Sequence, residues 1–387
     1  MHVMPLHLSI GIDEHNAFVL YAFCEPQNLV LPIQIPERLL DIGTRLLGSP
    51  TPVYYDDPHE LGRELGSVLY PTEVQDLMER AAALALRSKR RVQIQLQIAV
   101  PELAALPWEW ATIATSQPWA PARSDDFPVV RHSAVASPAP TIVVEGPLRV
   151  LVCVGEADSD ALRLLHSLLS VEIAQNRISI DVVVVSTSTD IDVALRRNPP
   201  HIIHFVAAVS LDADQVVTMH YDTTIDIDEL QDLLPHYPSI GMVVITPVGP
   251  QSAQLLAFPQ IYAALLLNRT LVTAIAFGGM CRADVITRYA ATCYNAILDG
   301  TPIDLAVTRA RRVLGNIDID PLWGYPQLRM VPGAEHVFAR APVSARADWL
   351  RSAGLVVLVV CLLVTVTILG RYLGGGTLPR FIQSMLP

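Results

Sequence analysis

From residue 148 to residue 331, short apolar segments alternate with amphipathic segments of helical spacing. The apolar segments, such as LRVLVCVG and SIDVVVVS, are apolar along most of their length rather than at every second position. Strands that are covered by helices on both faces have this composition, and they belong to parallel sheets. The pattern therefore predicts an α/β fold with a mostly parallel sheet and helices on both of its faces.

The first third of the chain has a different pattern. We expect short strands before residue 34, helical segments over 60–87 and a strand over 91–100. In that strand apolar residues alternate with glutamine, so one face should be solvent-exposed or hydrogen-bonded. Residues 116–147 are rich in proline, alanine and serine, which indicates a connecting loop. The sequence thus predicts a smaller α+β region over 1–146, followed by a larger α/β domain over 147–340.

Composition limits the classes of function. Hydrophobic residues make up 51% of the 387 positions and charged residues 17%, which predicts a folded chain with a sizeable core. The net charge is −11, Lys89 is the only lysine and the arginines are scattered, so no nucleic-acid surface is expected. The five cysteines form no CxxC pair and no zinc-like cluster. We therefore expect a reducing compartment and neither a metal nor another cofactor.

Near the C-terminus, GLVVLVVCLLVTVTIL runs from residue 354 to residue 369 without a charge. With one flanking residue on each side, the run would extend about 27 Å as a helix, enough for a thin bilayer. A buried core helix is the alternative, but arginines bracket the run as interfacial anchors do. The sequence therefore predicts a transmembrane helix over 353–372. The residues expected to define this anchor are Gly354, Leu358, Leu362, Val366, Leu369, Arg351 and Arg371.

The predicted span divides the C-terminal part into a juxtamembrane linker over 341–352, the helix and a short tail over 373–387. The N-terminus has no basic stretch followed by a long apolar run, so we expect no secretory signal. The protein should then be tail-anchored, crossing the membrane once with the bulk of the chain in the cytoplasm.

The carboxyl ends of the expected parallel strands are where a ligand or a reaction would be sought. No GxGxxG, GxxxxGK[ST] or GxSxG motif follows any of these strands, so the sequence indicates neither nucleotide binding nor a serine-hydrolase elbow. No pair of carboxylates stands there either. Two histidines, His201 and His204, do lie in the expected third strand. Three residues apart in a strand, they face opposite sides, and we expect both to be structural and hydrogen-bonded.

Six segments of the chain follow one another in a recognisable order. They are LGRELGSVLYP (61–71), PELAALPWEW (101–110), HIIHFVAAVS (201–210), MVVITPVG (242–249), GTPIDLAVTRARRVL (300–314) and DPLWGYPQLRM (320–330). This order resembles the CHAT domain, a caspase-like peptidase domain (clan CD) of bacteria. The most specific segment contains Pro107, Trp108 and Glu109 and resembles the family's PPELAALPWELL segment. The resemblance covers most of residues 60–335 and implies a caspase-like fold.

In that family a histidine after the third strand accepts the proton of a cysteine after the fourth, and the thiolate attacks a peptide carbonyl. Matched position by position, the first histidine of the family's HFSGHG falls on His204, the catalytic histidine on Ala208 and the cysteine on Val248. The resemblance therefore implies a pseudopeptidase, which is not an enzyme. The alternative is a relocated nucleophile, with Cys281 and His204 as the candidate pair.

Three further features have a structural and a functional interpretation. The tryptophans around Glu109 should fix a domain interface, with the carboxylate accepting hydrogen bonds; a recognition surface is the alternative. Arg309, Arg311 and Arg312 should lie on a solvated helix face, or else bind an acidic partner or lipid head groups. The aspartates between residues 212 and 228 lack EF-hand spacing, so a solvated loop is expected rather than a Ca²⁺ site.

Together these features predict a CHAT-like pseudopeptidase, anchored in the inner membrane, that acts as a binding, scaffold or effector subunit of a bacterial defence or conflict system. The expected partners are the lipid bilayer and proteins such as an active protease, a TPR protein or a nucleotide-dependent switch, and self-association is compatible with this function. Two alternatives remain. One is a membrane-disrupting effector triggered by assembly, and the other is an active cysteine peptidase with a relocated nucleophile.

Overall fold

The computed structural model describes residues 2–49, 52–55, 57–115, 119–132, 139–155, 160–211, 217–221, 223–248, 254–267, 271–315 and 321–340. The chain divides into a compact unit, Met1–Ala339, and a second unit, Arg340–Pro387. Among the described residues, no helix combines the length and the apolar character needed to cross a bilayer. The predicted linker (341–352), transmembrane helix (353–372) and tail (373–387), with every residue of the predicted anchor, lie outside the described residues.

Five parallel strands form the centre of the larger region, in the spatial order β9-β8-β10-β13-β15. The strand that comes first in the chain lies inside this sheet, between the second and the third, which is the 2-1-3-4-5 order of a doubly wound fold. The predicted mostly parallel sheet is therefore present. The strands are β8 (Leu148–Val154), β9 (Ile178–Val184), β10 (Ile202–Leu211), β13 (Met242–Pro247) and β15 (Thr273–Phe277).

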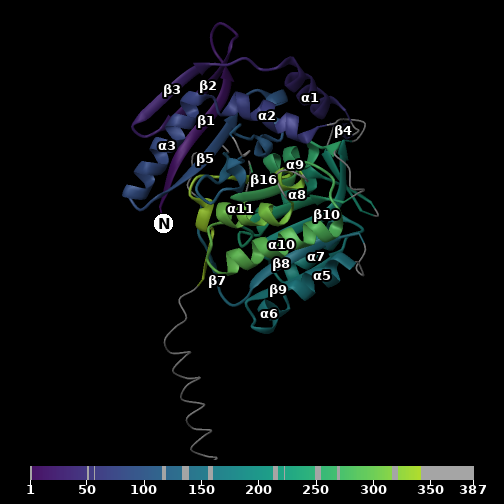
Figure 1. Cartoon of the computed structure of the whole chain (residues 1–387). Coiled ribbons are helices and arrows are strands. Elements are labelled where there is room, and N and C mark those ends of the chain that lie inside the picture. Colours follow the sequence, from purple (N-terminus) through teal and green to yellow (C-terminus); the bar gives the residue numbers. More distant parts are fainter. Residues whose placement is uncertain are drawn as a thin grey trace, which may run out of the picture. The chain divides into compact units, whose positions relative to one another are not determined.

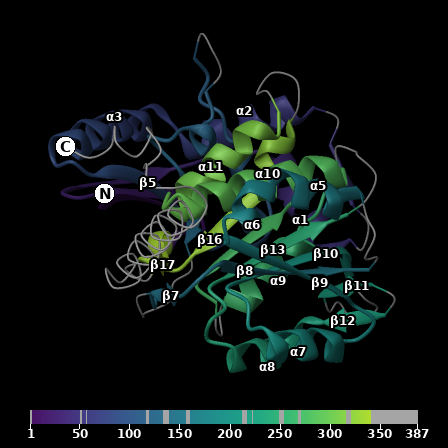
Figure 2. The same cartoon turned by 90° about the horizontal axis from the view of Figure 1, so that it is seen from below.

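Helices cover both faces of these strands, which explains why the strands are apolar on both sides. Figure 2 shows helices on both sides of the sheet. On one side lie α5 (Asp160–Leu168), α10 (Ala283–Leu298) and α11 (Ile303–Val313); on the other lie α7 (Ser188–Arg197), α8 (Ile227–Leu233) and α9 (Phe258–Leu267). α5 ends at Leu168, and a separate short helix, α6 (Ser170–Ala174), follows it.

The N-terminal region adds a second group of strands and helices, drawn in purple and blue in Figure 1. Its antiparallel strands are β1 (Val3–Ile12), β2 (Phe18–Cys24) and β3 (Gln27–Pro32), and β5 (Arg91–Ile98) lies parallel to β1. Its helices are α1 (Glu37–Gly48), α2 (Pro58–Leu69), α3 (Thr72–Arg87) and α4 (Pro101–Ala104).

One short strand joins the two regions into a single sheet. β6 (Val129–His132) pairs with β5 on one side and with β16 (Pro326–Met330) on the other, and β16 pairs antiparallel with β15. The predicted border between residues 146 and 147 therefore does not separate two compact units. β6 lies within the stretch that the sequence predicts as a loop. Its four residues form a strand in this proline-rich context because both neighbouring strands supply hydrogen bonds.

From Arg91 to Gln95, the glutamine face of β5 is buried, and Asp304 of α11 accepts hydrogen bonds from it. Both terminal nitrogens of the Arg91 guanidinium donate to Asp304, at 2.5 and 2.8 Å, and the Gln93 amide donates to the same carboxylate at 2.5 Å. Gln95 donates to Gln93 at 2.9 Å. The polar face predicted from the sequence is therefore the contact between the N-terminal region and the last long helix.

The glycines of the LGRELG segment allow α2 to pack closely on its neighbour. A Cβ at Gly66 would lie 1.9 Å from the carbonyl oxygen of Thr112, and one at Gly62 would lie 2.7 Å from that of Trp110. Only glycine permits this approach of two backbones. This contact holds residues 108–112 against α2.

Candidate functional site at the carboxyl ends of the strands

The positions that correspond to the family's catalytic pair lie side by side. Ala207 pairs with Pro247 in the parallel register of β10 and β13, and the amide of Val248 donates to the carbonyl of Ala207 at 3.2 Å. Paired residues of parallel strands point to the same side of the sheet. Ala208 and Val248 are thus level neighbours on one face, and both side chains are apolar.

Val248 closes a small apolar cavity instead of presenting a nucleophile. The cavity, with a volume of about 40 Å³, lies between the strand ends and the helices α5 and α10, and its lining includes Val154, Val206, Val248 and Ile286. One water molecule needs about 10–15 Å³, so the cavity has room for a few water molecules.

His204 lies in the interior, four residues before Ala208. Its Nε2 is 3.1 Å from the hydroxyl of Thr246 and its Nδ1 is 3.0 Å from the hydroxyl of Tyr294. Burial lowers the pKa of His204 to about 4, so the imidazole is neutral at pH 7. With both ring nitrogens hydrogen-bonded, His204 holds β10, β13 and α10 together.

His201 lies at the start of the strand. Its Nδ1 accepts a hydrogen bond from the amide of Arg149 at 2.9 Å, and its ring meets Phe338 edge-on. Burial, followed by repulsion from Arg149, lowers the pKa of His201 to about 4. His201 therefore connects the beginnings of β8 and β10.

These neutral histidines should make the fold sensitive to acid. The unfolded chain binds protons at the ordinary histidine pKa of 6.5, whereas folded His204 binds one only near pH 4, so stability falls as the pH is lowered from 6.5 to 4. For one histidine this loss amounts to about 3 kcal/mol. Urea unfolding at pH 4, 5 and 6.5 should show a markedly smaller pH dependence for His204→Gln than for the wild type. His15→Gln, which changes an exposed histidine, should leave the dependence unaltered; an equal slope in His204→Gln would contradict the prediction.

The candidate pair of Cys281 and His204 is not brought together. Cys281 forms an isolated parallel bridge with Val248, and His204 pairs with Val244 in β13. Val248 comes four residues after Val244, so the partners of these two residues, Cys281 and His204, lie about 13 Å apart along the strand direction. A general base needs contact at about 3 Å. The geometry therefore excludes this dyad.

The segment around Glu109 lies at the junction of the two regions. Both carboxylate oxygens of Glu109 accept hydrogen bonds from Arg131 of β6, at 3.0 and 2.8 Å, and Arg131 also donates to the carbonyls of Ala104 and Leu106. The indole of Trp108 donates to the carbonyl of Leu103 at 2.6 Å. Pro107 precedes the 3-10 helix η1 (Trp108–Trp110), whose three side chains are all buried. The expected hydrogen bonds to this carboxylate are present, and an arginine donates them.

The three arginines of α11 do not share one environment. Arg311 is fully buried and donates to the carbonyls of Pro326 and Ala122, so the prediction of a solvated face is wrong for this residue. It is wrong because η2 (Pro121–Arg123) and β16 cover that side of the helix, which the helix sequence does not reveal. Arg309 and Arg312 are exposed, and both contact Asp125.

No metal site is found among the described residues, which contain no group of three or more histidine, cysteine, aspartate or glutamate side chains placed to hold an ion. Asp226 and Asp228 lie at the start of α8. Asp212, Asp214 and Asp222 lie outside the described residues.

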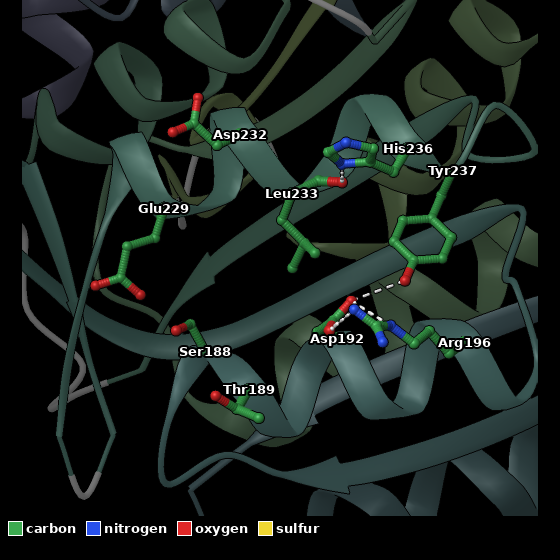
Figure 3. A pocket seen from close by; sticks show the side chains of 9 residues that line it. All are labelled: Ser188, Thr189, Asp192, Arg196, Glu229, Asp232, Leu233, His236 and Tyr237. Atoms are coloured by element: carbon green, nitrogen blue, oxygen red, sulfur yellow. Dashed lines mark hydrogen bonds and ion pairs between the residues drawn. The ribbon is translucent and has the colours of Figure 1, made fainter.

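A groove of about 790 Å³ lies between α7 and α8 and was not predicted from the sequence. Figure 3 shows its lining, in which Asp192 contacts Arg196 and the hydroxyl of Tyr237, while Glu229 and Asp232 project from α8. Three carboxylates and one guanidinium give the groove a negative charge, which attracts basic groups. The sequence could not reveal it, because its walls come from separate helices.

The strand order and the two helical layers define a doubly wound α/β protein with a large mixed, mostly parallel sheet. No family model matches the chain, and no curated protein matches it. Its structure is similar to a chain in two crystal structures of the Saccharomyces cerevisiae separase–securin complex. The TM-score is 0.44 in the 3.0 Å structure and 0.40 in the 2.6 Å structure, with 10% sequence identity in both. The match covers 85% and 87% of this chain and, in both structures, 30% of the other chain.

Proposed function

We propose that this protein is a membrane-anchored binding subunit built on a caspase-like fold, without cysteine-peptidase chemistry at the family's catalytic positions. The observation that carries the proposal is the pair of level neighbours Ala208 and Val248, which offer a methyl and an isopropyl group where a base and a nucleophile would have to meet. Neither group can accept or transfer a proton.

The described contacts support the same proposal. The imidazole of His204 is hydrogen-bonded to Thr246 and Tyr294, and the cavity behind Val248 is small and mostly apolar. The groove between α7 and α8, by contrast, lies within the 300–1,000 Å³ range of ligand-binding clefts. We infer that a partner with a basic segment docks there. A place in a bacterial defence or conflict system follows from the CHAT resemblance and belongs to the proposal.

The anchor part of the proposal predicts a large change in localisation. The full chain, expressed in bacterial cells, should sediment with the inner membrane and resist extraction with carbonate, because sixteen consecutive uncharged residues bury enough apolar surface to hold it there. Deleting residues 354–387 should move the protein to the soluble fraction. Deleting residues 373–387 alone, which keeps the apolar run, should not.

Two outcomes would change this assignment. If the form lacking residues 354–387 still sediments with the membrane, the run is not the anchor. If expression of the full chain permeabilises the cell and the deletion abolishes this effect, the membrane-disrupting effector replaces the passive anchor.

A further inference from the structure

A serine, a histidine and a threonine meet on the β-hairpin that extends β10 beyond the parallel sheet. β10 continues to Leu211 and there pairs antiparallel with β11 (Val217–His220), which pairs with β12 (Thr224–Asp226). We propose that Ser210 is an activated nucleophile, with His220 as its general base and Thr224 as the residue that positions the imidazole. This activity goes beyond the proposed binding function and does not depend on it.

The distances fit these three roles. The hydroxyl oxygen of Ser210 is 2.5 Å from Nε2 of His220, and the hydroxyl oxygen of Thr224 is 3.4 Å from Nδ1 of the same ring. A nucleophile in contact with a base that a third group orients is the arrangement shared by serine and cysteine hydrolases. Each of the three residues comes from a different strand of the hairpin.

The surrounding hydrogen bonds favour the productive tautomer. We assign the ring proton to Nδ1, which donates to Thr224, so Nε2 is left to accept the proton of Ser210. The hydroxyl of Thr218 is 3.3 Å from Nε2, but it donates to the carbonyl of Ser210 at 3.5 Å and does not need the ring nitrogen as acceptor. Nε2 therefore remains available to the serine.

The pair is accessible from solvent. His220 is exposed and Ser210 is half-buried, in contrast to the interior His204. His220 stands directly opposite Ala208 in the hairpin register, so its neighbours on β10 are the methyl group of Ala208 and the hydroxyl of Ser210. The carboxyl end of a parallel strand is also where α/β folds place their chemistry. The position that lacks the family's histidine thus has another histidine beside it, on the next strand.

The reaction that this geometry permits is acyl transfer from a small carboxylic ester. Oγ of Ser210 forms a bond to the carbonyl carbon while its proton passes to Nε2 of His220. The bond from that carbon to the leaving oxygen then breaks, and the leaving alcohol takes the proton from Nε2. Water, deprotonated by His220, releases the acid and restores the serine. No oxidant, metal or cofactor enters this balance.

The test uses a fluorophosphonate probe on the full chain in detergent, where Oγ bonds to phosphorus and fluoride leaves. We expect stoichiometric labelling, mapped by mass spectrometry to Ser210, and none in Ser210→Ala. His220→Gln should slow labelling at least about tenfold, since general-base assistance is worth more than that. Ser239→Ala, which removes a hydroxyl bonded to the carbonyl of Pro200, is the matched control and should label as the wild type does.

Two conservative substitutions test the role of Thr224. Thr224→Val should slow labelling and Thr224→Ser should restore it, which a purely structural role of the methyl group would not produce. Absence of labelling in the folded wild type would overturn the proposal. Labelling of Ser210 at the same rate in His220→Gln would also overturn it, because the serine would then be merely exposed. Near-ultraviolet circular dichroism and a melting curve for each variant separate loss of the pair from loss of the fold.

Discussion

Replacing Glu109 with glutamine should lower the free energy of unfolding by about 3 kcal/mol or more, the usual consequence of leaving a buried charge unpaired. Glu109 is fully buried and bound by Arg131 through two hydrogen bonds. Its charge also acts on Arg311 and Arg329. Burial, followed by repulsion from Arg131, lowers the pKa of Arg329 to about 9, and Glu109 opposes that shift. Glutamine keeps the shape but leaves these guanidinium groups without the opposing charge.

The measurement is urea unfolding at neutral pH, monitored by tryptophan fluorescence. Glu60→Gln is the matched control, because it removes the same charge from an exposed ion pair with Arg38, at 2.8 Å, and should cost less than about 1 kcal/mol. A loss below 1 kcal/mol in Glu109→Gln would show that the junction does not depend on this carboxylate.

Introducing the catalytic pair of the CHAT family should create a reactive thiol. In the double variant Ala208→His, Val248→Cys the two new side chains would stand level on adjacent strands and on the same face of the sheet. An imidazole beside a thiol lowers the thiol pKa and raises the thiolate fraction at pH 7. We expect iodoacetamide to alkylate the introduced thiol about tenfold faster than in Val248→Cys alone.

The four cysteines within the described residues should contribute little to this measurement. Cys24, Cys153, Cys281 and Cys293 are buried, and burial raises the thiol pKa of Cys293 to about 12. Ala208→Gln combined with Val248→Cys provides a polar but non-basic control. If that control reacts as fast as the histidine variant, the two positions do not face each other and the correspondence with the family's catalytic pair is wrong. Mapping the alkylated peptide identifies which thiol has reacted.

The elements differ in how far their own sequence specifies them. The continuous apolar runs of β8, β10 and β13 predict buried parallel strands, because only strands covered on both faces need no polar residues. The alternating glutamines of β5 predict one polar face, and that face is present. β6 could not be predicted, since four residues carry no periodicity and the strand is defined by its neighbours. Arg311 likewise has the spacing of a surface residue and lies in the interior.

The candidate sites follow the same division. The sequence by itself determined the α/β class and the apolar nature of residues 208 and 248, because these depend on local pattern and on order along the chain. Only the tertiary structure decided that both ring nitrogens of His204 are hydrogen-bonded and that Cys281 lies far from His204 along the strands. It also decided that Ser210 meets His220 and Thr224. Those contacts join residues from separate strands and helices. Their distances are fixed by strand register and by helix packing, which no single segment encodes.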